Sequence, residues 1–205
     1  MRKKSHLALT NFILDNADQN EIITKKRTLK FGGLVPDLVP SFLTKKHRID
    51  VTFDILEKKI HNLINNFNYE KGFTFFNIRD LGEITHYLAD YFTFPHNIQY
   101  EGSLKDHCVY EKELMDTFKA YVKDFDTICR LQMRTFREDL SCLSDAGDIC
   151  SYVKKFHRDY IVQDHTVLSD CQHIVLISAL VVQAILRIIS DKGFLFVRNQ
   201  KIAFA

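Results

Sequence analysis

The scarcity of proline and glycine most constrains how this chain can fold. Only three prolines and seven glycines occur in 205 residues, and between them apolar side chains recur at i, i+3 and i+4 rather than at alternate positions. The pattern predicts helices near residues 5–17, 50–67, 78–94, 104–143, 147–160 and 165–190. We therefore expect an all-α protein, a single-domain multi-helix bundle over residues 1–205, which is long enough to bury a substantial core.

Charge and cysteine content narrow the class of protein further. The formal net charge of +2 is too small to favour nucleic-acid binding, although basic clusters at residues 2–4, 25–27 and 45–48 could steer a small anion. Five cysteines without a C-x-x-C pair are typical of packed thiols in a reducing compartment. Polar residues interrupt the apolar start of the chain, so we interpret it as mature sequence rather than a secretory signal, and expect a cytoplasmic protein.

The most apolar run, Ile174 to Ile189, is the candidate for a membrane-spanning segment. It contains Gln183 and Arg187 and is shorter than the roughly 20 residues that cross a bilayer. We expect no transmembrane segment here and interpret the run as the buried central helix of the bundle.

A constrained connection separates the first two predicted helices. The segment "FGGLVPDLVPSFLTKKHR", residues 31–48, contains two glycines and two prolines, which forbid a continuous helix. Asp37 lies between Pro36 and Pro40, so we expect it on a shaped loop of the kind that often binds ligands.

Two histidine and carboxylate pairs occur at a spacing suited to metal binding. His86 with Asp90, and His107 with Glu111, stand four residues apart, which places each pair on one helix face. With nine histidines and 26 acidic residues, either pair by itself is expected by chance on a solvated helix face.

His96 links the two pairs. On a continuous helix it would lie about 15 Å from His86, too far to share an ion, but Pro95 precedes it and predicts a turn. His96 could then join His107 and Glu111 around a second metal. The segment "SLKD", residues 103–106, reads as a capping box that begins the helix carrying His107.

The order of these residues resembles a known family. "HYLADYFTFPHN", residues 86–97, followed by "HCVYE", residues 107–111, is similar to the zinc-dependent phospholipase C family, whose ligands run H-x3-D, a histidine ten residues after the first, and then H-x3-E. Upstream ligands of that family have counterparts here in His6, Asp37 and His47. The resemblance covers residues 6 to about 116.

The resemblance implies the ligands of each ion and a helical fold with a metal cluster between helices. A first zinc would be held by Asp37, His47, His86 and Asp90. A second would be held by His96, His107 and Glu111. Whether a third ion is bound by Asp90 and His6 is left undecided. Secreted members of the family complete that site with an N-terminal tryptophan, and this sequence contains none.

The resemblance also implies hydrolysis of a phosphodiester or phospholipid-like small substrate by a metal-activated water, with Asp37 as the general base. Two other hypotheses stay open: a metal-stabilised helical binding or regulatory protein without turnover, and a metal-free helical interaction protein. Nucleic acid is not an expected partner. His61, His157, His165 and His173 lack the pattern and are expected as surface or core histidines, and Cys108 and Cys171 as small buried hydrophobes.

Overall fold

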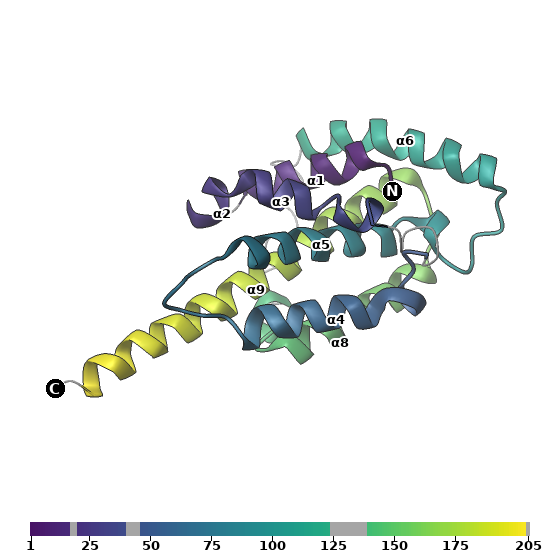
Figure 1. Ribbon diagram of the computed structural model, residues 1–205. Helices are drawn as coiled ribbons and strands as arrows, with labels where there is room; N and C mark the ends of the chain where they lie inside the picture. The colour runs from purple at the N-terminus through teal and green to yellow at the C-terminus, as the bar shows by residue number, and fades with distance from the viewer. Residues whose placement is uncertain (17–19, 40–45, 124–138, 204–205) are drawn as a thin grey trace.

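The computed structural model describes residues 1–16, 20–39, 46–123 and 139–203. Within these ranges every regular element is a helix (Figure 1), which confirms the predicted all-α fold class. In chain order the elements are α1 (Lys3–Asp15), α2 (Asn20–Thr24), α3 (Lys26–Gly32), the 3-10 helix η1 (Val35–Asp37), α4 (Ile49–Asn65), α5 (Phe75–Tyr91), the 3-10 helix η3 (Phe94–His96), α6 (Leu104–Lys123), α8 (Ala146–Ile161) and α9 (Val167–Ala203). The single-domain extent, residues 1–205, stays a prediction.

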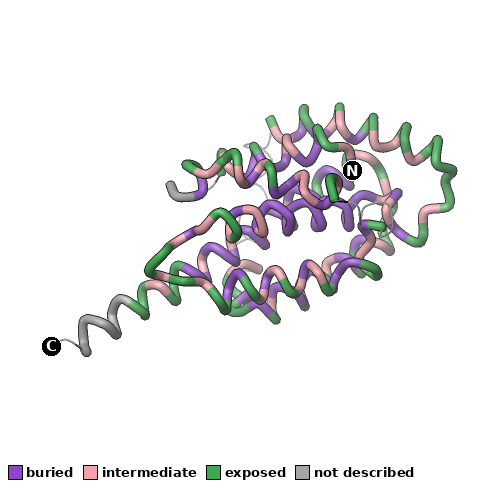
Figure 2. Tube along the Cα trace, in the orientation of Figure 1, coloured by how far each residue is buried: buried purple, intermediate pink, exposed green. Residues whose placement is uncertain are grey.

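Helix α5 is the central element of the fold. It packs against α1, α3, α4 and α9, and every residue from Leu81 to Tyr91 is buried (Figure 2). A capping box fixes its start: Thr74 accepts a hydrogen bond from the backbone of Asn77, and the Asn77 side chain accepts one from the backbone of Thr74. The buried second half of α5 must satisfy its polar side chains internally, and it carries both His86 and Asp90.

Two glycines bring α3 and α5 unusually close. A Cβ atom at Gly82 would collide with the backbone of α3, and one at Gly32 would collide with the backbone of Arg79 on α5. This close approach places the carbonyl oxygen of Gly33 2.9 Å from Nδ1 of His86. Helix α3 therefore helps to orient a predicted metal ligand.

Helix α9 runs behind α5 and extends past the other helices at its C-terminal end (Figure 1). Residues Val167–Phe196 are long and apolar enough to cross a membrane by length and composition, but 67% of their apolar 18-residue stretch is buried inside the fold. The helix is longer than the predicted 165–190. Its final turns expose Phe194 and Leu195, so they lie beyond the core that the apolar run indicated.

The connection between α1 and α4 contains short helices that the sequence analysis did not predict, although no continuous helix spans it. Helices α2 and α3 have five and seven residues, too few to show a helical repeat in the sequence. Phe31 and Gly32 belong to α3, and Asp37 ends η1. Pro40 lies outside the described residues. The predicted helix at 104–143 is α6 over its first part, and residues 124–138 are not described.

Candidate metal centre

The structure brings the eight predicted ligands to one end of α5. His86 and Asp90 lie on α5, His6 on α1 and Asp37 on η1. His47 directly precedes α4, His96 ends η3, and His107 and Glu111 lie on α6. Segments distant in sequence therefore supply one cluster of nitrogen and oxygen donors.

The first group of donors surrounds one oxygen of Asp90. Oδ2 of Asp90 lies 3.0 Å from Nδ1 of His47 and 3.1 Å from Nε2 of His86. The two imidazole nitrogens lie 3.1 Å from each other. Oδ1 of Asp37 closes the group at 3.6 Å from His86 and 3.7 Å from His47. These are the four residues predicted to hold the first zinc.

The contact between His86 and α3 decides which nitrogen of His86 faces this group. A carbonyl oxygen only accepts, so Nδ1–H of His86 donates to the Gly33 carbonyl. Nε2 therefore faces Asp90 and Asp37, the position from which it could bind a cation. A backbone carbonyl in this role is the usual outer partner of a metal-bound histidine.

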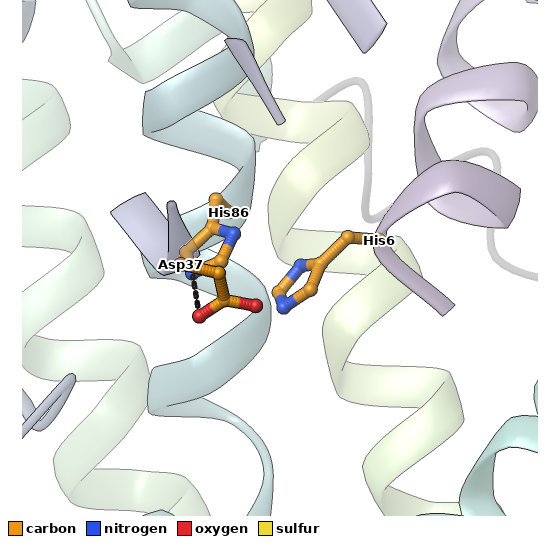
Figure 3. Close-up of side chains that lie close together, drawn as sticks. All are labelled: His6, Asp37 and His86. Atoms are coloured by element: carbon orange, nitrogen blue, oxygen red, sulfur yellow. Dashed lines mark ion pairs between the residues drawn. The ribbon is translucent and has the colours of Figure 1, made fainter. Parts of the chain in front are cut away.

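His6 lies on the other side of His86 and has unsatisfied ring nitrogens. The two rings stack at a centroid separation of 3.8 Å, and Figure 3 shows His6 directed toward Asp37 and His86. His6 is 2% exposed, and neither of its nitrogens has a hydrogen-bond partner among the described residues. Burial, reinforced by the nearby His86, lowers its pKa to about 3. A neutral, buried imidazole without a partner fits a cation ligand, because leaving it unpaired is costly.

The second group consists of His96, His107 and Glu111, whose ligand atoms lie within 4.8 Å of one another. Oε1 of Glu111 lies 3.1 Å from Nε2 of His96 and 3.3 Å from Nε2 of His107. Burial would raise the pKa of Glu111, but the hydrogen bonds with His107 and His96 outweigh it and hold that pKa well below its usual range. The turn at Pro95 therefore brings His96 to α6, as predicted.

The α-amino group of Met1 lies between the two groups. Its nitrogen is 2.6 Å from Oδ1 of Asp90, 2.9 Å from Nε2 of His96 and 3.0 Å from Oε1 of Glu111. Burial opposes the charged amine, but Asp90 and Glu111 outweigh burial and raise its pKa. The sequence motifs did not include Met1. Its position shows that the pattern of charges there favours a cation.

Asp90 connects the groups, since Oδ2 faces His47 and His86 while Oδ1 faces Met1 and lies 3.4 Å from His6. The carboxylate is 1% exposed. Burial alone would raise its pKa, but the Met1 amine and the adjacent histidines hold that pKa well below its usual range. An ionised, buried carboxylate needs cationic partners. Together with the unpaired nitrogens of His6, this donor set of imidazoles and carboxylates without thiolates fits zinc.

Asn97 and His157, to which the sequence analysis assigned no role at the centre, hold the His96 turn in place. Nδ2 of Asn97 donates to the carbonyls of Tyr91 and Thr93, so Oδ1 of Asn97 must accept from Nε2–H of His157, 2.9 Å away. Helix α8 thereby anchors the residue next to His96. Because His157 lies 60 positions from Asn97, no local pattern could have paired them.

Asp170 on α9 anchors the same turn from the other side. It is fully buried, and its carboxylate accepts hydrogen bonds from the backbone of Phe94 and from the hydroxyl groups of Tyr110 and Tyr160 at 2.7, 2.9 and 2.7 Å. Burial raises the pKa of Asp170 to about 6. This network ties η3 to α6, α8 and α9, so the second group rests on a rigid support.

A pocket of about 810 Å³ opens over the centre, and Asp37, His47, His96, His107 and Glu111 line it. His6, His86 and Asp90 lie deeper. The basic side chains at its wall are Arg2, Lys3, Lys46 and Arg48. Its lining also includes Ile98 and Leu104, which are 65% and 80% exposed. The pocket therefore offers positive charge beside exposed apolar surface.

The other histidines lie outside the two groups, as do the four cysteines that the structure describes. Cys171 is buried as predicted, whereas the prediction for Cys108 is wrong: it is exposed and lines the pocket. The i, i+4 geometry of α6 turns the side of the helix that carries His107 and Cys108 toward the opening instead of the core.

Comparison with known proteins agrees with this geometry. The sequence model of the zinc-dependent phospholipase C family matches residues 5–167, which is more than half of the 205-residue chain. No curated protein and no solved structure matches. The matched region includes all eight predicted ligands, and these converge in space. The chain belongs to the zinc-dependent phospholipase C family.

Proposed function

We propose that the protein is a zinc-dependent phosphodiester hydrolase that acts on a phospholipid-like small substrate. One observation carries the proposal: the buried Asp90 carboxylate is shared by two groups of imidazole and carboxylate donors, and ligands of both groups line one pocket. Such adjacent sites suit phosphodiester chemistry, in which both the attacking and the leaving oxygen need stabilisation.

The proposed chemistry divides between the ion and the chain. Zinc, when bound by these donors, acts as a Lewis acid and lowers the pKa of a coordinated water to about 7. Asp37 is the proposed general base, because its side chain is 11% exposed, lines the pocket and lies next to His86 and His47. Its carboxylate can accept a proton from a water in the pocket while η1 holds its position.

The pocket wall supports an anionic, partly apolar substrate. Arg2 donates to the Cys108 carbonyl, and Arg48 pairs with Asp50, so both guanidinium groups are held in place. Because Asp50 neutralises much of the Arg48 charge, the positive potential at the wall comes mainly from Arg2, Lys3 and Lys46, and it favours a phosphate. The exposed Ile98 and the neighbouring apolar lining offer contact to an acyl or glyceride portion.

A cytoplasmic location is part of this proposal. The four described cysteines, Cys108, Cys142, Cys150 and Cys171, are all free, in keeping with a reducing compartment.

A metal-stabilised binding protein without turnover is the second candidate. The absence of tryptophan from the sequence keeps it open, because secreted members of the family close the third metal site with an N-terminal tryptophan. Metal content is expected to be similar for both candidates, so turnover distinguishes them.

The test compares wild-type protein with Asp37→Asn and with a control, Asp116→Asn, at an exposed position of α6. Protein purified without chelator is assayed for metal content, helical circular dichroism and hydrolysis of a chromogenic phosphodiester. We expect zinc-dependent turnover that chelator abolishes and zinc restores.

Asp37→Asn is expected to reduce turnover by about 10²-fold or more, with native helicity and with zinc retained at His96, His107 and Glu111. Full activity in that variant would exclude Asp37 as the base. A fully metallated wild type that hydrolyses no phosphodiester would instead favour the binding protein.

A further inference from the structure

A second cluster of metal-ligating side chains lies where α4 packs against α8. Glu57 and His61 stand one turn apart on α4, and Cys150 faces them from α8. One donor atom from each residue lies within 4.8 Å of the other two. Helices α4 and α8 are in direct contact and lie side by side in Figure 1. The sequence could not reveal this group, because Cys150 is far from the other two along the chain.

This cluster is separate from the centre at Asp90. His47, the nearest candidate ligand along the chain, lies just before α4, and His61 follows it by 14 positions. At 1.5 Å per residue this corresponds to about 20 Å along the helix. One ion cannot bridge that distance, so the α4–α8 cluster must be considered as a site of its own.

The donor set has the composition of a transition-metal site. It combines a thiol, an imidazole and a carboxylate, and thiolate with imidazole selects zinc and its neighbours over calcium or magnesium. The pair on α4 is preorganised by its i, i+4 spacing. Cys150 is 2% exposed, whereas the Glu57 side chain is 37% exposed. The site therefore has a buried sulfur and a side open to solvent, through which an ion can enter and a water can complete four-coordination.

The interactions that the His61 and Glu57 side chains make in the metal-free protein are weak. Nδ2 of Asn65 lies 3.4 Å from Nδ1 of His61, a long contact. Nζ of Lys154 lies 3.8 Å from Glu57, and both side chains are substantially exposed, so this ion pair contributes little. The Lys154 ammonium also lies 4.3 Å above the ring of Phe53. It would oppose a cation at Glu57, which gives the site a built-in competitor.

We propose that Glu57, His61 and Cys150 form an additional, thiolate-containing site for a zinc-type divalent cation that ties α4 to α8. On binding, the S–H bond of Cys150 breaks, a sulfur–metal bond forms, and the proton leaves to solvent. Burial raises the pKa of the metal-free thiol to about 12, so near neutral pH one proton is released for each ion bound, and affinity rises with pH.

Cobalt(II) tests the proposal directly, because a thiolate ligand to cobalt gives a charge-transfer absorption in the near ultraviolet that imidazole and carboxylate ligands do not give. Metal-free full-length protein is titrated with cobalt under reducing conditions. We expect the band in wild type and its loss in Cys150→Ser. It should persist in Cys108→Ser and Cys142→Ser, which alter exposed cysteines, and in His86→Ala, which alters the centre at Asp90.

Two further variants keep the test decisive if Cys150→Ser folds poorly. His61→Gln changes a partly exposed side chain and should weaken the cobalt affinity, read from the band, by about tenfold or more. Lys154→Met keeps the aliphatic stem but removes the opposing charge, so the affinity should rise a few-fold. Absence of the band in wild type at saturating cobalt overturns the proposal, as does a band that survives Cys150→Ser or disappears in Cys108→Ser.

Discussion

The buried His157 makes the stability of the protein sensitive to mild acid. It is 8% exposed, and its Nε2–H donates to Asn97, whose own amide is fixed by the carbonyls of Tyr91 and Thr93. Burial lowers the pKa of His157 from 6.5 to about 4.

The sign and size of the effect follow from the difference in protonation between the folded and unfolded states. Between about pH 6.5 and pH 4 the unfolded chain binds a proton at His157 that the folded protein excludes, so the free energy of unfolding falls as the pH falls. The stabilisation is fully present above the unfolded pKa. From the two pKa values, about 2 kcal/mol is lost by pH 5, and about 3 kcal/mol below pH 4.

His157→Gln isolates this contribution. A glutamine amide can still donate to Asn97 but does not titrate. Free energies of unfolding are measured by urea denaturation and far-ultraviolet circular dichroism, in chelator, from about pH 7.5 to pH 5. All other titrating groups are common to both proteins, so the difference between wild type and variant should shrink by about 2 kcal/mol over this range.

A second non-titrating variant, His157→Asn, separates ionisation from packing. Its stability near neutral pH will differ from that of His157→Gln because the side chain is shorter, but its dependence on pH should be the same. If wild type and both variants lose stability in parallel as the pH falls, the imidazole is not kept neutral, and our reasoning about the turn next to His96 is wrong.

Three other predictions follow from the fold and the centre. His86→Ala and His107→Ala should each lower zinc content and the midpoint of thermal unfolding, measured by elemental analysis and calorimetry, because each removes a ligand that joins separate helices; unchanged zinc content in both would contradict the ligand assignment. Gly82→Ala should lower the free energy of unfolding by about 2 kcal/mol, because its Cβ would collide with the α3 backbone, whereas Gly147→Ala, in the first turn of α8, should change it by less than about 1 kcal/mol. The protein should stay in solution without detergent, because most of the apolar window in Val167–Phe196 is buried; sedimentation with added membranes would contradict this.

Local features of the sequence account for the longer helices and for part of the centre. The capping box at Ser103 and Asp106 is present as predicted, and the turn at Pro95 brings His96 to α6. These predictions succeed because helix periodicity, capping and i, i+4 spacing depend on residues within a few positions of one another. His6 and His47 entered the ligand set through family resemblance alone, whereas the constrained loop had already marked Asp37 as a candidate. The role of all three as ligands stays a prediction.

Tertiary structure decided what lies around those local elements. Helix α3 is too short to show a repeat, yet it approaches α5 closely enough to orient His86. The support of the His96 turn by His157, and the grouping of Cys150 with His61, join residues that are dozens of positions apart. A sequence specifies such contacts only through the packing of whole helices, whose distances and crossing angles depend on many side chains at once. The sequence by itself thus determined the longer helices and which donors share a helix face, whereas packing determined which donors meet.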